Sequence, residues 1–138
     1  YREELAQNLA DHDVASKGQT VAIQHYMTFA LENPELFQLL FERPIPGFVP
    51  SEAGLEEGRR LIELGHQATE SLRAADKVHA SIGTEQARDL FVGLTHGLTA
   101  QHLANEPHLP VGEGRFGSLI PLAVRALELL YRHGLEDD

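Results

Sequence analysis

The residues whose types and spacing could support chemistry are histidines and a glutamate on predicted helices. Glu63 and His66 have the ExxH spacing that puts two metal ligands on one helical face, as in di-iron bundles. Such a site needs a second ExxH motif and further inward-facing glutamates, and the sequence has no second copy. We therefore expect His66 to line a cavity or the surface, and we predict no metal site and no cofactor.

Two further histidines, His96 and His102, lie six residues apart on one predicted helix. This spacing suits shared metal ligation poorly, and no HExxH motif is present. We expect His96 to be buried and hydrogen-bonded, with direct ligand contact as the alternative and the direction of its side chain left open. His102 is one of the few residues of that helix that we expect to contact water. A small helical metal-binding protein or enzyme is the alternative function, with the candidate residues Glu63, His66, His96 and His102.

The stretch Gly112 to Gly117, GEGRFG, matches the GxGxxG pattern of dinucleotide-binding loops. It follows a proline-rich loop, and no strand–helix–strand unit surrounds it, so a phosphate would have no sheet edge to bind beside. The chain has no cysteine, which excludes disulfides and thiolate catalysis. No Ser/His/Asp grouping is detectable from residue order, so we predict no catalytic residue and interpret the protein as non-enzymatic.

Length and charge narrow the class of protein. A chain of 138 residues suits one domain with its own core. Its formal net charge of -10 disfavours DNA and anionic membranes, because affinity for both depends on Lys and Arg. No apolar run reaches the roughly 18 to 20 residues that span a bilayer, and the start YREE is no signal peptide. We expect a soluble cytoplasmic protein, and a start inside a helix without Met suggests missing upstream residues.

Apolar residues recur at helical spacing along the chain, and no segment alternates with period two, so the predicted fold class is all-α. A short helix is expected from Tyr1 to Ala10, closed by Asp11-His12-Asp13. A buried helix should follow over residues 18–32. Asn33 and Pro34 predict a junction, with Asn33 as N-cap of a helix that ends before Pro44.

The segment 44–50 must be irregular, because it holds three prolines and a glycine. Ser51 then caps a long helix that runs to about Ala75. One stripe of this helix combines glycines with apolar residues, which implies that another helix crosses it closely. The members of the stripe are Leu55, Gly58, Ile62, Gly65, Thr69 and Leu72.

The helix over residues 84–105 has no clearly polar face, so it must be covered on several sides. The last helix, from about Arg115 or Ser118 to His133, has two apolar faces. Pro121 fits its first turn if Ser118 is the N-cap, and a start at Arg115 predicts a kink near Gly117. One face holds Leu119, Ala123, Leu127 and Leu130, and the other holds Leu122, Ala126 and Leu129.

The segment from Phe29 to Phe48, FALENPELFQLLFERPIPGF, followed by Pro-Ser-Glu, resembles the C-terminal ligand-binding and dimerisation domain of TetR-family transcriptional regulators, in the WHG-type subgroup. The resemblance continues at THGL, residues 95–98, and from Phe116 onward. The tryptophan of the subgroup name falls on Val92 here, and the chain has no Trp. The helix-turn-helix that reads DNA in the family lies N-terminal to this domain and is absent from the chain.

The resemblance implies an antiparallel bundle of about six helices, in which residues 1–138 form a single effector-binding domain and residues 1–13 are the remnant of a helix leading to the missing DNA-binding head. In the family the last two long helices form a four-helix interface between two copies. The candidate interface residues are Gly93, Gly97, Ala100, Leu122, Ala126, Leu127 and Leu129.

The earlier helices of the family surround a mostly apolar cavity for a small effector. The expected partners are thus a second copy of the chain, a hydrophobic or aromatic small molecule, and DNA only through the missing head. The implied function is that of a regulator, with repression favoured. The candidate effector-binding residues are Tyr26, Phe29, Phe37, Phe41, Ile62, His66, Leu94, Thr95 and His96. For any single one of the four aromatic residues among them, a place in the ordinary core is the more frequent alternative.

Overall fold

The computed structural model describes the backbone of residues 2–42 and 51–135, and the side chains of residues 17–42 and 51–135. The predicted irregular segment 44–50 lies outside the described residues. All regular structure in the described ranges is helical, as predicted. The elements are α1 (Arg2–Glu32), α2 (Pro34–Phe37), the π-helical turn η1 (Gln38–Glu42), α3 (Glu52–Ala74), α4 (Thr84–Asn105), α5 (Gly114–Gly117) and α6 (Ile120–His133).

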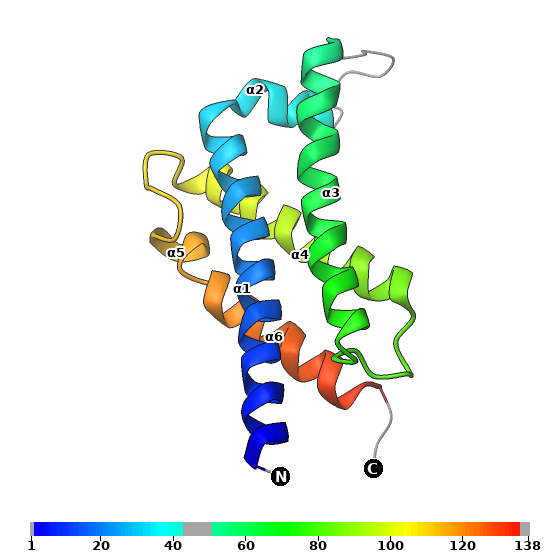
Figure 1. Ribbon diagram of the computed structural model, residues 1–138. Coiled ribbons are helices and arrows are strands. Elements are labelled where there is room, and N and C mark those ends of the chain that lie inside the picture. The colour runs from blue at the N-terminus through cyan, green and yellow to red at the C-terminus, as the bar shows by residue number, and fades with distance from the viewer. Residues whose placement is uncertain (1, 43–50, 136–138) are drawn as a thin grey trace.

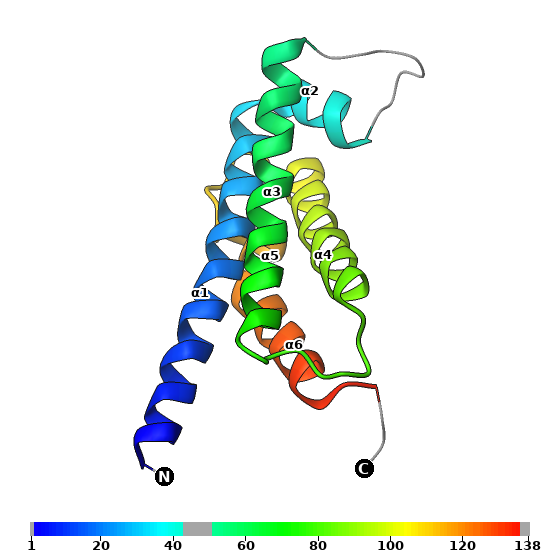
Figure 2. The ribbon, with the colours of Figure 1, turned by 45° about the vertical axis from the view of Figure 1, so that its right-hand side comes forward.

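The long helices form an antiparallel bundle. The chain runs up α1, crosses over at α2, descends α3, ascends α4 and descends α6 (Figure 1). Figure 2 shows α3 between α1 and α4, with α6 behind them toward the lower end. The first turns of α1 extend past the other helices in both views. No described helix is long and apolar enough to cross a membrane.

A single helix replaces the two that we predicted for residues 1–32. We expected Asp11-His12-Asp13 to end the first helix, but α1 is continuous over 31 residues. Asp and His lower helix propensity by well under about 1 kcal/mol each, and the segment contains no proline, so nothing breaks the hydrogen-bond ladder. Gly18 also lies within the helix, in a place where a Cβ atom would meet open space.

The predicted boundaries at Pro34 and Ser51 are confirmed, with one correction. Ser51 caps α3 through a hydrogen bond from the Gly54 amide to its hydroxyl, at 3.2 Å. Asn33 occupies the N-cap position of α2, but its side chain makes no capping bond. Its amide instead donates to the Phe29 carbonyl at 3.2 Å, so it closes the end of α1.

The glycines of α3 allow close approach, as predicted. A Cβ atom at Gly58 would lie 3.5 Å from the Leu40 side chain of η1, and one at Gly65 would lie 3.3 Å from the Phe91 ring of α4. The contact at Gly58 is an ordinary van der Waals distance, whereas at Gly65 the Phe91 ring would have to shift by a few tenths of an ångström. The absence of a side chain at Gly65 therefore lets α4 pack closely on α3.

Two groups of buried residues form the core. The larger group joins α1, α3, α4 and α6 through residues that include Ile23, Met27, Leu72, Phe91, Ile120, Leu127 and Tyr131. The smaller group lies where α1 meets α2, and consists of Tyr26, Phe29, Ala30 and Phe37, with Leu36, Leu40, Phe41, Leu61 and Leu103 packed against it.

The two predicted faces of α6 are distinct in the structure. Ala123 and Leu127 are buried, and Leu119 and Leu130 are partly buried against the larger core. The helix begins at Ile120, with two residues between it and the end of α5, so Ser118 is not the N-cap. A break at residues 118–119 stands where a helix starting at Arg115 predicted a kink near Gly117. Pro121 occupies the first turn, where its missing N–H costs no intrahelical bond.

The GxGxxG segment forms the tight entry to α5. Gly112 and Gly114 have φ of 88° and 84°, a region that L side chains rarely adopt. The Glu106 carboxylate accepts a hydrogen bond from the Arg115 amide at 2.7 Å. The Glu106 carboxylate therefore already binds the Arg115 amide, which a phosphate-binding loop would need to have free.

Tyr131 fastens α6 to the start of α4. Its hydroxyl donates to the Ala87 carbonyl at 2.7 Å, and its ring is 1 % exposed. Burial raises the pKa of Tyr131 to about 12, although the nearby Gln19 side chain opposes this shift. Unfolding restores an ordinary tyrosine pKa near 10.0, so above that pH the unfolded chain loses a proton that the folded chain keeps.

We therefore predict that the free energy of unfolding falls as the pH rises from about 10 to about 12, by up to about 1.4 kcal/mol per pH unit for this one group. Tyr131→Phe should lower stability by about 1 kcal/mol at pH 8 through the lost hydrogen bond, and should make the alkaline loss shallower. Urea unfolding at pH 8, 10 and 11 measures both. Equal alkaline losses in the two proteins would contradict the assignment.

Candidate functional site

Five of the predicted effector-binding residues meet in what we call the aromatic cluster: Tyr26, Phe29, Phe37, Phe41 and His96. The Tyr26 ring packs edge-on against Phe37 at 5.6 Å and lies 5.0 Å from Phe41. Phe29 packs edge-on against Phe41 at 6.4 Å, and His96 stacks on Phe37 at 5.5 Å between ring centroids. Such offset and edge-to-face arrangements are the favourable ones for aromatic pairs.

A hydrogen bond of 2.9 Å joins the Tyr26 hydroxyl to Nδ1 of His96. The His96 side chain therefore points toward Tyr26, a direction that the sequence left open. Burial raises the pKa of Tyr26, and the negative charge of Glu42 adds to the effect. When Nδ1 of His96 carries no proton, it accepts the hydrogen bond from the Tyr26 hydroxyl. His96 is hydrogen-bonded, as the sequence predicted, but it is half-buried where we expected full burial.

A groove of about 490 Å³ opens beside the aromatic cluster, between α1, α2 and the first turns of α3. Its volume lies within the range of about 300 to 1,000 Å³ that is typical of small-molecule sites. We call it the α1–α3 groove. It is lined by His25, Thr28, Phe29, Glu32, Asn33, Leu36, Ser51, Ala53, Gly54, Glu57 and Leu61.

Phe29 is the one predicted effector-binding residue among the groove's described lining residues. It also belongs to the aromatic cluster, so it separates the groove from the other rings. Sequence reasoning followed the apolar phase of α1 and missed the polar phase beside it. His25, Thr28 and Glu32 recur at three- and four-residue spacing, which could have indicated a second functional face.

The other predicted effector-binding residues lie elsewhere. Ile62 is 43 % exposed and is not part of either core group, because its neighbours Leu61 and Leu64 take the inward positions of that part of α3. His66 is half-buried. Leu94 packs against the larger core, and Thr95 is buried with no hydrogen-bond partner for its hydroxyl among the described residues.

Our expectation that His102 faces water is wrong. It is fully buried, and its Nε2 lies 3.0 Å from the Leu109 carbonyl, to which it can donate. Its Nδ1 lies against Gly117, where a Cβ atom would approach it to 3.3 Å. The loop after α4 and the α5 helix fold back over His102 and cover it, which the spacing within α4 could not indicate.

The alternative metal site receives no support from the geometry. Glu63 is exposed on α3, and its carboxylate accepts a hydrogen bond of 3.4 Å from Gln67 on the same helix. Across the described ranges, no three His, Asp or Glu side chains are grouped as metal ligands would be.

A second candidate surface lies on the outer faces of α4 and α6. Gly93 and Gly97 are exposed with open space around them, and Ala100 is half-buried. Leu122 is 65 % exposed, and Ala126 and Leu129 are exposed as well. Leu127 is the exception among the predicted interface residues, because it is 3 % exposed and belongs to this chain's own core. The exposed Leu90 and Val92 on α4 were not predicted.

The family model described as Tetracyclin repressor-like, C-terminal domain, matches residues 21–116. The match covers the aromatic cluster, every described lining residue of the α1–α3 groove, and α4. Comparisons with curated proteins and with solved structures give no match.

The burial of Phe37 and the exposure of Ile62 predict a large loss of stability on mutation at the first position and a small one at the second. Phe37→Ala removes a fully buried ring and should lower the free energy of unfolding by about 3 to 5 kcal/mol. Ile62→Ala should change it by no more than about 0.5 kcal/mol, because the side chain already contacts water. Chemical denaturation of the two variants measures the difference. Similar costs at both positions would contradict the placement of Ile62 outside the core.

Proposed function

The chain belongs to the family of tetracyclin repressor-like C-terminal domains, and we propose that it is the effector-binding and dimerisation domain of a transcriptional regulator, with repression as its mode. In this proposal the α1–α3 groove takes the small molecule, and the outer faces of α4 and α6 bind a second copy of the chain. DNA is contacted by a separate N-terminal head. We propose no catalytic role.

The observation that carries the proposal is the position of Phe29. Its side chain lines the groove and also packs on Phe41 within the aromatic cluster. From there Phe41 contacts Tyr26, and Tyr26 is bonded to His96 on α4. A molecule in the groove therefore acts on a packed series of side chains that leads from α1 to α4, the helix of the proposed interface.

The position of α1 supports the proposal that binding in the groove is transmitted toward the DNA-binding head. The helix carries four lining residues of the groove near its end, and its first turns extend beyond the bundle (Figure 1). A tilt of α1 at the groove would displace those first turns most. For an effector to act, it must bind one tilt better than the other, and a coupling of about 1 to 3 kcal/mol is typical.

The outer faces of α4 and α6 support the proposed dimer. Four of the seven exposed large apolar side chains among the described residues lie on these two helices, namely Leu90, Val92, Leu122 and Leu129. Two such helices from each copy would form a four-helix interface about a two-fold axis. Gly93 and Gly97, which have no neighbour at the Cβ position, would let the paired helices approach closely.

We predict that Ala126→Glu dissociates the dimer without unfolding the chain, because position 126 is exposed within one subunit and a charge buried between two copies is costly. Analytical ultracentrifugation at high micromolar concentration measures the mass. Ala74→Glu is the control, since Ala74 is exposed on α3, outside the proposed interface. A parent chain that sediments as a monomer would contradict the proposed dimer.

We also predict that Ala53→Trp, which fills the groove from an exposed position, abolishes effector binding. Small molecules that raise the melting temperature of the parent should fail to stabilise this variant. At a hundredfold excess over Kd, a bound effector stabilises the parent by about 2.7 kcal/mol. Ala74→Trp is the matched control and should respond like the parent. Equal stabilisation of Ala53→Trp and parent would place effector binding outside the groove.

A further inference from the structure

Two carboxylates from different helices line the α1–α3 groove, together with apolar side chains. Glu32 comes from the last turn of α1, and Glu57 comes from the second turn of α3. We infer that the groove binds an organic cation, an amine or ammonium with an apolar body. The inference rests on the proposed function, in which this groove is the effector site, and it specifies the charge of the effector.

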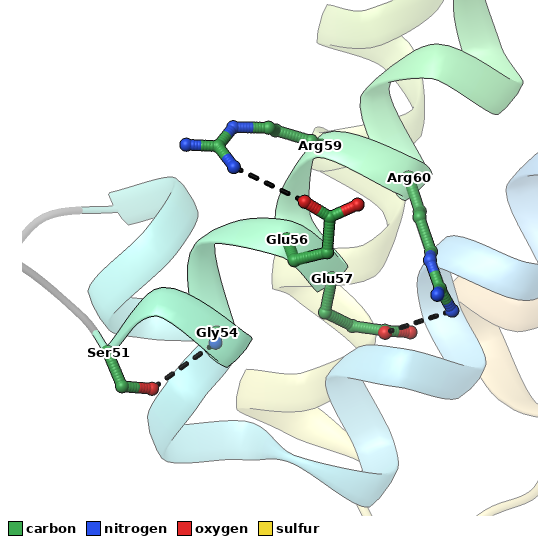
Figure 3. Close-up of polar contacts among 6 residues, drawn as sticks. All are labelled: Ser51, Gly54, Glu56, Glu57, Arg59 and Arg60. Atoms are coloured by element: carbon green, nitrogen blue, oxygen red, sulfur yellow. Dashed lines mark hydrogen bonds and ion pairs between the residues drawn. The ribbon is translucent and has the colours of Figure 1, made fainter.

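The charged groups of the described lining favour a cation. No lysine or arginine is among these residues, and His25 is the one basic side chain. Glu57 has a partner in Arg60, at 3.8 Å, but the two side chains are 46 % and 71 % exposed (Figure 3). Exposed pairs of this kind contribute little, so Glu57 can turn to a ligand at small cost.

The partial positive charge at the N-terminus of α3 would favour an anion instead. Groups of the chain itself already offset much of this charge. Ser51 accepts the hydrogen bond of the Gly54 amide, as Figure 3 shows, and Glu52 adds a negative charge to the first turn. An anionic ligand would also meet Glu32 and Glu57 directly. The formal net charge of -10 strengthens the preference for a cation at longer range.

The apolar part of the groove specifies the rest of the ligand. Phe29, Leu36 and Leu61 give an aromatic and aliphatic wall, which suits a hydrocarbon or aryl body. The Phe29 ring can also stabilise a cation placed over its face. A purely apolar ligand would make no charge pair with the carboxylates of Glu32 and Glu57, and this missing interaction distinguishes it from an amine.

Three probes of nearly equal shape test the charge: 4-phenylbutylamine, 4-phenylbutanol and 4-phenylbutanoate. Isothermal titration of the full chain should show the amine binding about tenfold or more tighter than the alcohol, with the carboxylate weakest. The double variant E32Q/E57Q should weaken the amine about tenfold and leave the alcohol unchanged. Its matched control is E35Q/E56Q, which changes the net charge equally at positions outside the lining.

The outcomes separate the two proposals. If the alcohol binds as tightly as the amine, and Ala53→Trp blocks both, the groove remains the effector site and the cationic effector is overturned. If E35Q/E56Q weakens the amine as much as E32Q/E57Q, overall charge accounts for the preference and the inference fails. If no probe binds, or Ala53→Trp changes nothing, the groove itself is rejected. Circular dichroism verifies that each variant is folded.

Discussion

The hydrogen bond between Tyr26 and His96 is the interaction on which the aromatic cluster and the elements packed on it depend. It joins α1 to α4 across 70 positions of sequence, at 2.9 Å, within a cluster of rings. A polar pair at this place fixes the orientation of both rings more strictly than apolar contact would. Phe37 and Phe41 pack on these rings, and so α2 and η1 are placed over the end of the bundle.

The groove follows from that placement. With α2 and η1 held against the rings, Leu40 packs over Gly58, and the first turns of α3 lie beside the end of α1. Phe29 then has one side in the cluster and one side in the groove. The π-helical turn at Gln38–Glu42 is an irregularity of the kind that proteins often keep at functional sites. One side chain, Phe29, thus belongs both to the packed cluster and to the wall of the groove.

At the other side of the molecule, α4 and α6 each divide their apolar residues between two environments. Phe91 and Leu127 belong to the core, whereas Val92 and Leu122 face outward. This division explains how a chain of 138 residues carries more apolar helical surface than its own core can bury. In the proposed dimer, a second copy of the chain would cover this surplus.

The sequence by itself determined the all-α class, the boundaries at Pro34 and Ser51, the close approaches at Gly58 and Gly65, and the two faces of α6, because proline, caps, glycine and helical periodicity act within a few residues. It also indicated Tyr26, Phe29, Phe37 and Phe41 as candidate effector-binding residues, and this assignment stays a prediction.

Only the tertiary structure decided where those rings point and what lies beside them. The groove joins His25 and Glu32 to Glu57, residues that no local pattern relates. The burial of His102 required a loop to return over it, and Ile62 is exposed because Leu61 and Leu64 face the two cores instead. Such outcomes depend on contacts between distant segments, whose energies enter only when the helices pack.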